Sequence, residues 1–148
     1  MRHEDLPREL NEFADRLIGA AIEVRREPGP GFLERTYEMI LTHELQLCGM
    51  AVAQQVEIVV RSKGLDLPGH RLDLFVEKQI VVDLKAVEPV VAVHFAQMVR
   101  SLRAGDCPLG LHLNFGLPEL KDGICRRINK SSSVRSASLR SLCGSAWS

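Results

Sequence analysis

The chain lacks three features that would point to a particular class of protein. Its four cysteines are scattered with no Cys-x-x-Cys pair, which argues against a zinc site and a disulfide framework. No apolar run approaches the ~20 residues of a membrane span, and the N-terminus has no signal-peptide core, so we expect a cytoplasmic protein without a membrane segment. The formal net charge of +0 argues against non-specific binding to polyanions.

What the chain does contain is typical of one soluble domain. Hydrophobic residues make up 45% and charged residues 26% of its 148 residues, enough to bury a core without disulfides. Residues 131–148 contain eight serines and no periodicity. We therefore expect a domain over residues 6–130 and a disordered, Ser-rich tail over residues 131–148.

Apolar periodicity predicts two helices at the start of the domain. Apolar residues recur at helical spacing over residues 7–26 and again over residues 33–48. The two prolines and two glycines of residues 28–31 break the first helix, and Gly49 ends the second. On the second helix, Leu33 and Cys48 are among the side chains expected to face inward.

The rest of the domain predicts an α/β layer fold. From Val52 the spacing is that of a strand, and the pairs Lys63-Gly64 and Pro68-Gly69 are turn signals before a hairpin. A helix over about residues 90–103, a strand over 109–115 and a short edge strand over 123–128 follow. The helix between the third and fourth strands permits a parallel crossover, which predicts a mixed sheet of four to five strands flanked by helices.

The hairpin over residues 71–85 brings two aspartates together. With residues 77–79 as its turn, alternating apolar residues fall on one face and fix the register. The apolar pairs are Val76 with Ile80, Leu74 with Val82 and Leu72 with Leu84. The same register places Asp73 opposite Asp83, with Cβ atoms roughly 5 Å apart.

Like charges directly opposed destabilise a sheet, so folding alone gives no reason for this pair. A divalent cation between Asp73 and Asp83 would remove the repulsion, and carboxylates are the ligands that Mg²⁺ or Mn²⁺ prefers. Lys85 lies two residues along the strand and points to the same side. The alternative is a solvated outer face whose charges lie at the hairpin edge.

Several blocks of the sequence resemble the bacterial GxxExxY proteins, a family of the PD-(D/E)XK nuclease superfamily. The segment Gly31-Phe-Leu-Glu34-Arg-Thr-Tyr37 matches the family signature. Further similar blocks follow the family's order at residues 18–24, 29–31, 83–88, 94–97, 113–116 and 120–124. The resemblance covers about residues 6–129 and implies a restriction-endonuclease-like core of order α-β-β-β-α-β, in agreement with the periodicity.

This resemblance implies a metal-dependent nuclease that hydrolyses phosphodiester bonds, with DNA as its substrate. Asp73 and Asp83 take the places of the two acids that bind Mg²⁺ or Mn²⁺, and Lys85 takes the place of the catalytic lysine. Glu34 is a further candidate catalytic carboxylate. An equal alternative is a first-turn glutamate that the helix dipole favours.

The resemblance also implies residues that contact the substrate. Gln97 is similar to the glutamine that related nucleases carry on the helix after the Asp-x-Lys strand, and His94 lies on the same polar stripe. Tyr37 is the third candidate, whereas His112 has the pattern of a structural histidine. An equal alternative for the polar stripe is a flank without a ligand. The alternative function of the whole chain is a catalytically inactive nucleic-acid- or protein-binding module on the same fold.

Overall fold

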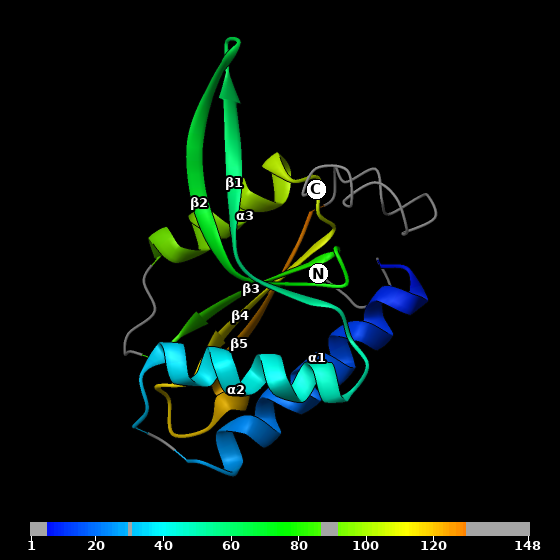
Figure 1. Cartoon of the computed structure of the whole chain (residues 1–148), viewed down its shortest axis with the longest axis vertical. Coiled ribbons are helices and arrows are strands. Elements are labelled where there is room, and N and C mark those ends of the chain that lie inside the picture. Colours follow the sequence, from blue (N-terminus) through cyan, green and yellow to red (C-terminus); the bar gives the residue numbers. More distant parts are fainter. Residues whose placement is uncertain (1–5, 30, 87–91, 130–148) are drawn as a thin grey trace.

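A computed structural model describes residues 6–29, 31–86 and 92–129 (Figure 1). The predicted order of elements is confirmed, and the predicted tail lies outside the described residues. In chain order the elements are α1 (Arg8–Arg26), α2 (Glu34–Leu47), β1 (Val52–Ser62), β2 (Leu65–Val76), β3 (Ile80–Lys85), α3 (Ala92–Ala104), β4 (Leu109–Asn114), the short 3₁₀ helix η2 (Leu120–Gly123) and β5 (Ile124–Ile128). The five strands form one mixed sheet of order β1-β2-β3-β4-β5, which confirms the predicted fold class.

The two N-terminal helices begin and end near their predicted residues. Gly49 has a φ of 81° directly after α2, a left-handed conformation that a glycine adopts without strain. The inward positions predicted for Leu33 and Cys48 are wrong, since both side chains are exposed. They are the residues that flank α2 at its two ends, so the helical stripe does not extend to them.

Strands β1 and β2 form a long antiparallel ribbon that projects beyond the rest of the sheet (Figure 1). The predicted turn at Lys63-Gly64 is confirmed, but the turn predicted at Pro68-Gly69 is wrong, because both residues lie inside β2. Pro68 pairs with Val59, next to a register shift at which β2 has one residue more than β1. Strand β3 pairs only with the last residues of β2, so at Pro68 only β1 is paired with β2, and a proline is tolerated in such an edge strand.

Helices cover both faces of the central strands, with α1 and α2 on one side and α3 on the other (Figure 1). Strands β3 and β4 run parallel on either side of the α3 crossover, and nearly all of their residues are buried. A Cβ added at Gly110 would lie 2.3 Å from Sδ of Met98, so α3 packs directly on β4 at this glycine. Gly110 pairs with Val81, two residues before Asp83, so α3 lies on the face that carries Asp83.

None of the helices in the described segments is long and apolar enough to cross a membrane.

Candidate active site

Two of the three predicted apolar pairs of the hairpin are confirmed. Val76 pairs with Ile80 and Leu74 with Val82, and residues 77–79 form the turn. Glu77 and Lys78 have φ values of 53° and 54°. Positive φ in such a short connection matches the right-handed twist of the strands that it joins.

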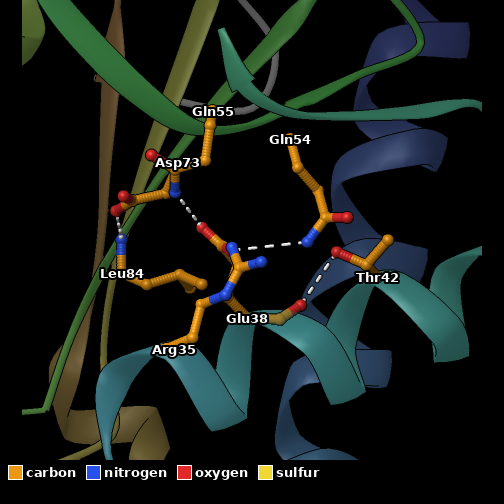
Figure 2. A network of polar contacts seen from close by, with 7 residues as sticks. All are labelled: Arg35, Glu38, Thr42, Gln54, Gln55, Asp73 and Leu84. Carbon is orange, nitrogen blue, oxygen red and sulfur yellow. Dashed lines mark hydrogen bonds and ion pairs between the residues drawn. The ribbon is translucent and has the colours of Figure 1, made fainter.

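The aspartates lie together just beyond the last pair of this ladder. The backbone N–H of Leu84 donates to Oδ2 of Asp73 over 2.8 Å, which holds the Asp73 carboxyl against β3 (Figure 2). Asp83 directly precedes Leu84 on β3, so its carboxyl group lies beside that of Asp73, and each acid shifts the pKa of the other. The two acids therefore share one face of the sheet, as the apolar register requires.

Burial and the neighbouring charges raise the pKa of Asp73 from 3.8 to about 7. Loss of hydration is the largest cause, and the hydrogen bond from Leu84 opposes it. The hydrogen bond and charge of Asp83 and the charge of Glu34 raise this pKa further. At neutral pH the carboxyl group of Asp73 is therefore partly protonated, and the negative charge of the pair lies mainly on Asp83.

Asp83 is 7% exposed, yet its pKa is lowered. Burial alone would raise this pKa, but the hydrogen bond with His112, the charge of Lys85 and the hydrogen bond with Asp73 outweigh it. Nδ1 of His112 lies 3.1 Å from Oδ2 of Asp83, and Nζ of Lys85 lies 3.7 Å from Oδ1. Lys85 and His112 thus hold Asp83 in its ionised form.

Helix α2 carries Glu34 to the same corner. Glu34 is the first residue of α2 and is partly buried. Its charge contributes to the raised pKa of Asp73, so the two carboxyl groups are electrostatic neighbours. The structure therefore brings together all four predicted catalytic residues, Asp73, Asp83, Lys85 and Glu34.

The sequence profile of the PD-(D/E)XK nuclease superfamily matches residues 11–128. The chain belongs to this superfamily. The match covers every element except the start of α1, and it supports a nuclease-type function for the domain. No curated protein and no solved structure matches the chain.

Nucleases of the PD-(D/E)XK superfamily generally use divalent metal ions, and the donor set at this corner fits one. Asp73 and Asp83 supply hard oxygen ligands, and a cation would offset the charges of Asp83 and Glu34, which add to the effect of burial on the pKa of Asp73. In the part of the chain that the structure describes, no group of three or more His, Cys, Asp and Glu side chains is placed to hold a metal. Mg²⁺ does not need one, because it keeps several waters and binds through one or two carboxylates.

Among the predicted substrate contacts, Tyr37 is placed in the core. Its side chain is 1% exposed, its hydroxyl donates to the carbonyl of Gly29 over 2.7 Å, and its ring stacks on Phe115 with centroids 4.5 Å apart. These contacts fasten the loop that precedes α2. Substrate contact by Tyr37 stays a prediction, and this burial does not favour it.

The other two predicted substrate contacts lie on α3. Gln97 is partly buried on this helix, which covers the face that carries Asp83, and its carbonyl accepts a hydrogen bond from Ser101. His94 also lies within α3, but its side chain is outside the described residues. A substrate role for both residues stays a prediction.

Sequence reasoning missed two residues at this corner. His112 was expected to be structural, and its contact with Asp83 depends on the parallel register of β3 and β4, which no local pattern reveals. Glu38 was not singled out at all, although its side chain is almost fully buried between α2 and β1 (Figure 2). A charged residue one position after Tyr37 reads as solvated unless the burial is known.

Proposed function

We propose that this chain is a metal-dependent nuclease that hydrolyses phosphodiester bonds in DNA. The observation that carries the proposal is the placement of the Asp73 carboxyl group on the backbone N–H of Leu84, next to Asp83 and its ion pair with Lys85. The superfamily supports the nuclease chemistry. The Gly31–Tyr37 signature supports assignment to the GxxExxY proteins, and the cytoplasmic location remains a proposal from the sequence.

Asp73 and Asp83 are the residues that would hold Mg²⁺ or Mn²⁺. When bound, such a cation polarises a phosphoryl oxygen and makes a bound water easier to deprotonate. Asp83 is prepared for this role because His112 and Lys85 keep it ionised. Asp73 has to release its proton to become a ligand, so the affinity for the cation should rise with pH up to about pH 7.

Lys85 supplies positive charge where negative charge develops on the phosphate. Its side chain is about one-fifth exposed, so its ammonium group reaches solvent while it stays beside Asp83. A fixed cation in a partly desolvated site stabilises a transition state more than it stabilises the ground state. Glu34 adds negative charge near Asp73, which favours a cation at this corner.

The proposal is tested by cleavage assays with single- and double-stranded DNA and RNA in Mg²⁺, in Mn²⁺ and in EDTA. Replacing Asp73 or Asp83 by Ala should abolish metal-dependent cleavage, and Lys85→Ala should lower it by roughly 10²–10³-fold. Glu34→Ala should be as severe as Asp83→Ala if Glu34 is a ligand, and milder if it only adds charge.

The matched control is Asp66→Ala, which removes an exposed aspartate of the same strand that pairs with Arg61 far from the acidic pair. This variant should cleave like the wild type. If the purified wild type binds nucleic acid but cleaves none of these substrates in either metal, the chain is the inactive binding module instead.

A further inference from the structure

Glu38 is a buried carboxylate held by three side chains. It is 3% exposed, and it accepts hydrogen bonds from Arg35 one turn earlier on α2 and from the Nε2 atoms of Gln54 and Gln55 on β1 (Figure 2). The Gln54 bond measures 3.3 Å. A buried charge survives only with such partners, so Glu38 fixes the place where α2 meets β1.

The backbone of β1 departs from strand geometry to make this contact. Neighbouring residues of a regular strand point to opposite faces, so two adjacent glutamines should not reach one carboxylate. Gln55 has a φ of 53°, a left-handed conformation that is unfavourable for a residue with a side chain. This conformation turns the Gln55 amide to the side of Gln54, where both bind Glu38.

The irregular residue lies opposite Asp73. Gln54 pairs with Leu74 and Val56 pairs with Leu72, and Gln55 and Asp73 are the residues skipped between these two pairs. Strand β1 is thus distorted at the position that faces the first acid of the candidate active site. Strained backbone gathers at sites whose surroundings hold it in place.

Helix α2 connects this contact to the acidic pair. Glu34 and Glu38 are one turn apart and lie on the same side of the helix. Glu38 is bound to β1, whereas Glu34 acts electrostatically on Asp73. Any rotation or shift of α2 that broke the Glu38 contacts would therefore also move Glu34 relative to Asp73.

We infer that Glu38 is a positioning residue, which binds Gln54 and Gln55 and so holds Glu34 and the Asp73 strand in the geometry that a divalent cation requires. The inference rests on the proposed function, because it concerns the same metal site. Removing a residue that orients a metal ligand without touching the metal typically changes the metal affinity by about 10–100-fold.

The test uses substitutions that remove the contact without straining the backbone. Gln55→Gly removes the amide and relieves the unfavourable φ, and Gln55→Asn keeps an amide that tolerates this φ but is too short to reach. Glu38→Gln removes the charge at nearly constant shape. The matched control is Lys63→Gly, which relieves a φ of 50° in the distant turn between β1 and β2.

The first measurement is Mn²⁺ affinity by electron paramagnetic resonance, without nucleic acid and well below the melting temperature of each variant. We expect Kd to rise about tenfold in Gln55→Gly, Gln55→Asn and Glu38→Gln, and to stay at the wild-type value in Lys63→Gly. In cleavage assays, kcat should fall while KM for DNA stays unchanged. A merely structural contact would change the melting temperature and leave Kd and kcat as they are.

The outcomes separate the inference from the proposed function. Wild-type Mn²⁺ affinity in all three variants overturns the positioning role and leaves the nuclease proposal standing. Weakened Mn²⁺ binding in these variants, together with a wild type that binds Mn²⁺ but cleaves nothing, supports the positioning role and refutes the nuclease. A wild type that binds no Mn²⁺ refutes both.

Discussion

Replacing Asp73 by Asn should stabilise the metal-free protein at and above neutral pH. The pKa of Asp73 is raised to about 7, so the folded chain holds this proton until the pH approaches 7, while the unfolded chain releases it near 3.8. The stability that the wild type has at low pH is therefore lost as the pH rises from about 4 through 7. Asn at this position mimics the protonated acid, since it accepts from the Leu84 N–H and donates to Asp83.

The size of the effect follows from this rise in pKa. At about 1.4 kcal/mol for each pH unit, a change from 3.8 to about 7 sets an upper limit of roughly 4 kcal/mol. Asp73 is only partly buried, so solvent screening reduces this limit, and we expect about 2 kcal/mol. Asp83→Asn should act in the opposite direction above pH 4, because the pKa of Asp83 is lowered by His112 and Lys85 and its charge is stabilising.

The assay is urea unfolding in EDTA at pH 4 and at pH 8 for the wild type, Asp73→Asn and a control. The advantage of Asp73→Asn over the wild type should grow by about 2 kcal/mol between the two pH values. The control is Asp66→Asn, which changes an exposed aspartate of the same strand and should stay within about 0.5 kcal/mol of the wild type at both pH values. A constant difference between Asp73→Asn and the wild type would refute the reasoning.

A divalent cation should reverse this order. Binding to the native state alone stabilises by RT ln(1 + [L]/Kd), which is about 2.7 kcal/mol at a concentration of 100 Kd. Saturating Mn²⁺ at pH 8 should therefore raise the stability of the wild type and leave Asp73→Asn, which lacks one carboxylate ligand, nearly unchanged. If Mn²⁺ stabilises both proteins equally, Asp73 is not part of a metal site.

Two further substitutions test how the fold supports the site. Tyr37→Phe removes the bond to the Gly29 carbonyl and should cost about 0.5–1.5 kcal/mol of unfolding free energy, with KM for DNA unchanged. A raised KM would instead support the predicted substrate contact of Tyr37. Gly110→Ala should cost about 1–3 kcal/mol in urea unfolding because its Cβ would meet Sδ of Met98 at 2.3 Å, and Met98→Ala in the same chain should recover part of the loss. Equal stability of Gly110→Ala and the wild type would contradict the close packing of α3 on β4.

The register of the acidic hairpin was predictable because one face of it is apolar. A slip by one residue would have moved Leu74, Val76 and Val82 out of the core, so burial of these side chains determines the strand pairing. The same logic fails at Pro68-Gly69, where a proline and a glycine are compatible with either a turn or an unpaired strand edge. What decides between them is that β3 pairs with only the last residues of β2, and no local pattern carries that information.

The partners of the acids could not be predicted because they come from other elements. His112 reaches Asp83 across a parallel pairing, and in the sequence the two residues are separated by the whole α3 crossover. The burial of Glu38 depends on how α2 packs against β1. Sequence patterns thus located the acids on β2 and β3. The tertiary structure supplied the groups that set their pKa values and the contacts that hold α2 against β1.

Several positions that break local rules lie at one corner of the molecule. The carboxyl groups of Asp73 and Asp83 lie next to each other, a carboxylate is buried at Glu38, and Gln55 has a positive φ within a strand. Each of these features opposes folding, whereas the central strands and helices follow their apolar patterns closely. Unfavourable features that gather at one place are expected where binding or catalysis needs them. The cost to stability at Asp73 and Asp83 should therefore fall when a cation is bound, which the reversal between EDTA and Mn²⁺ measures directly.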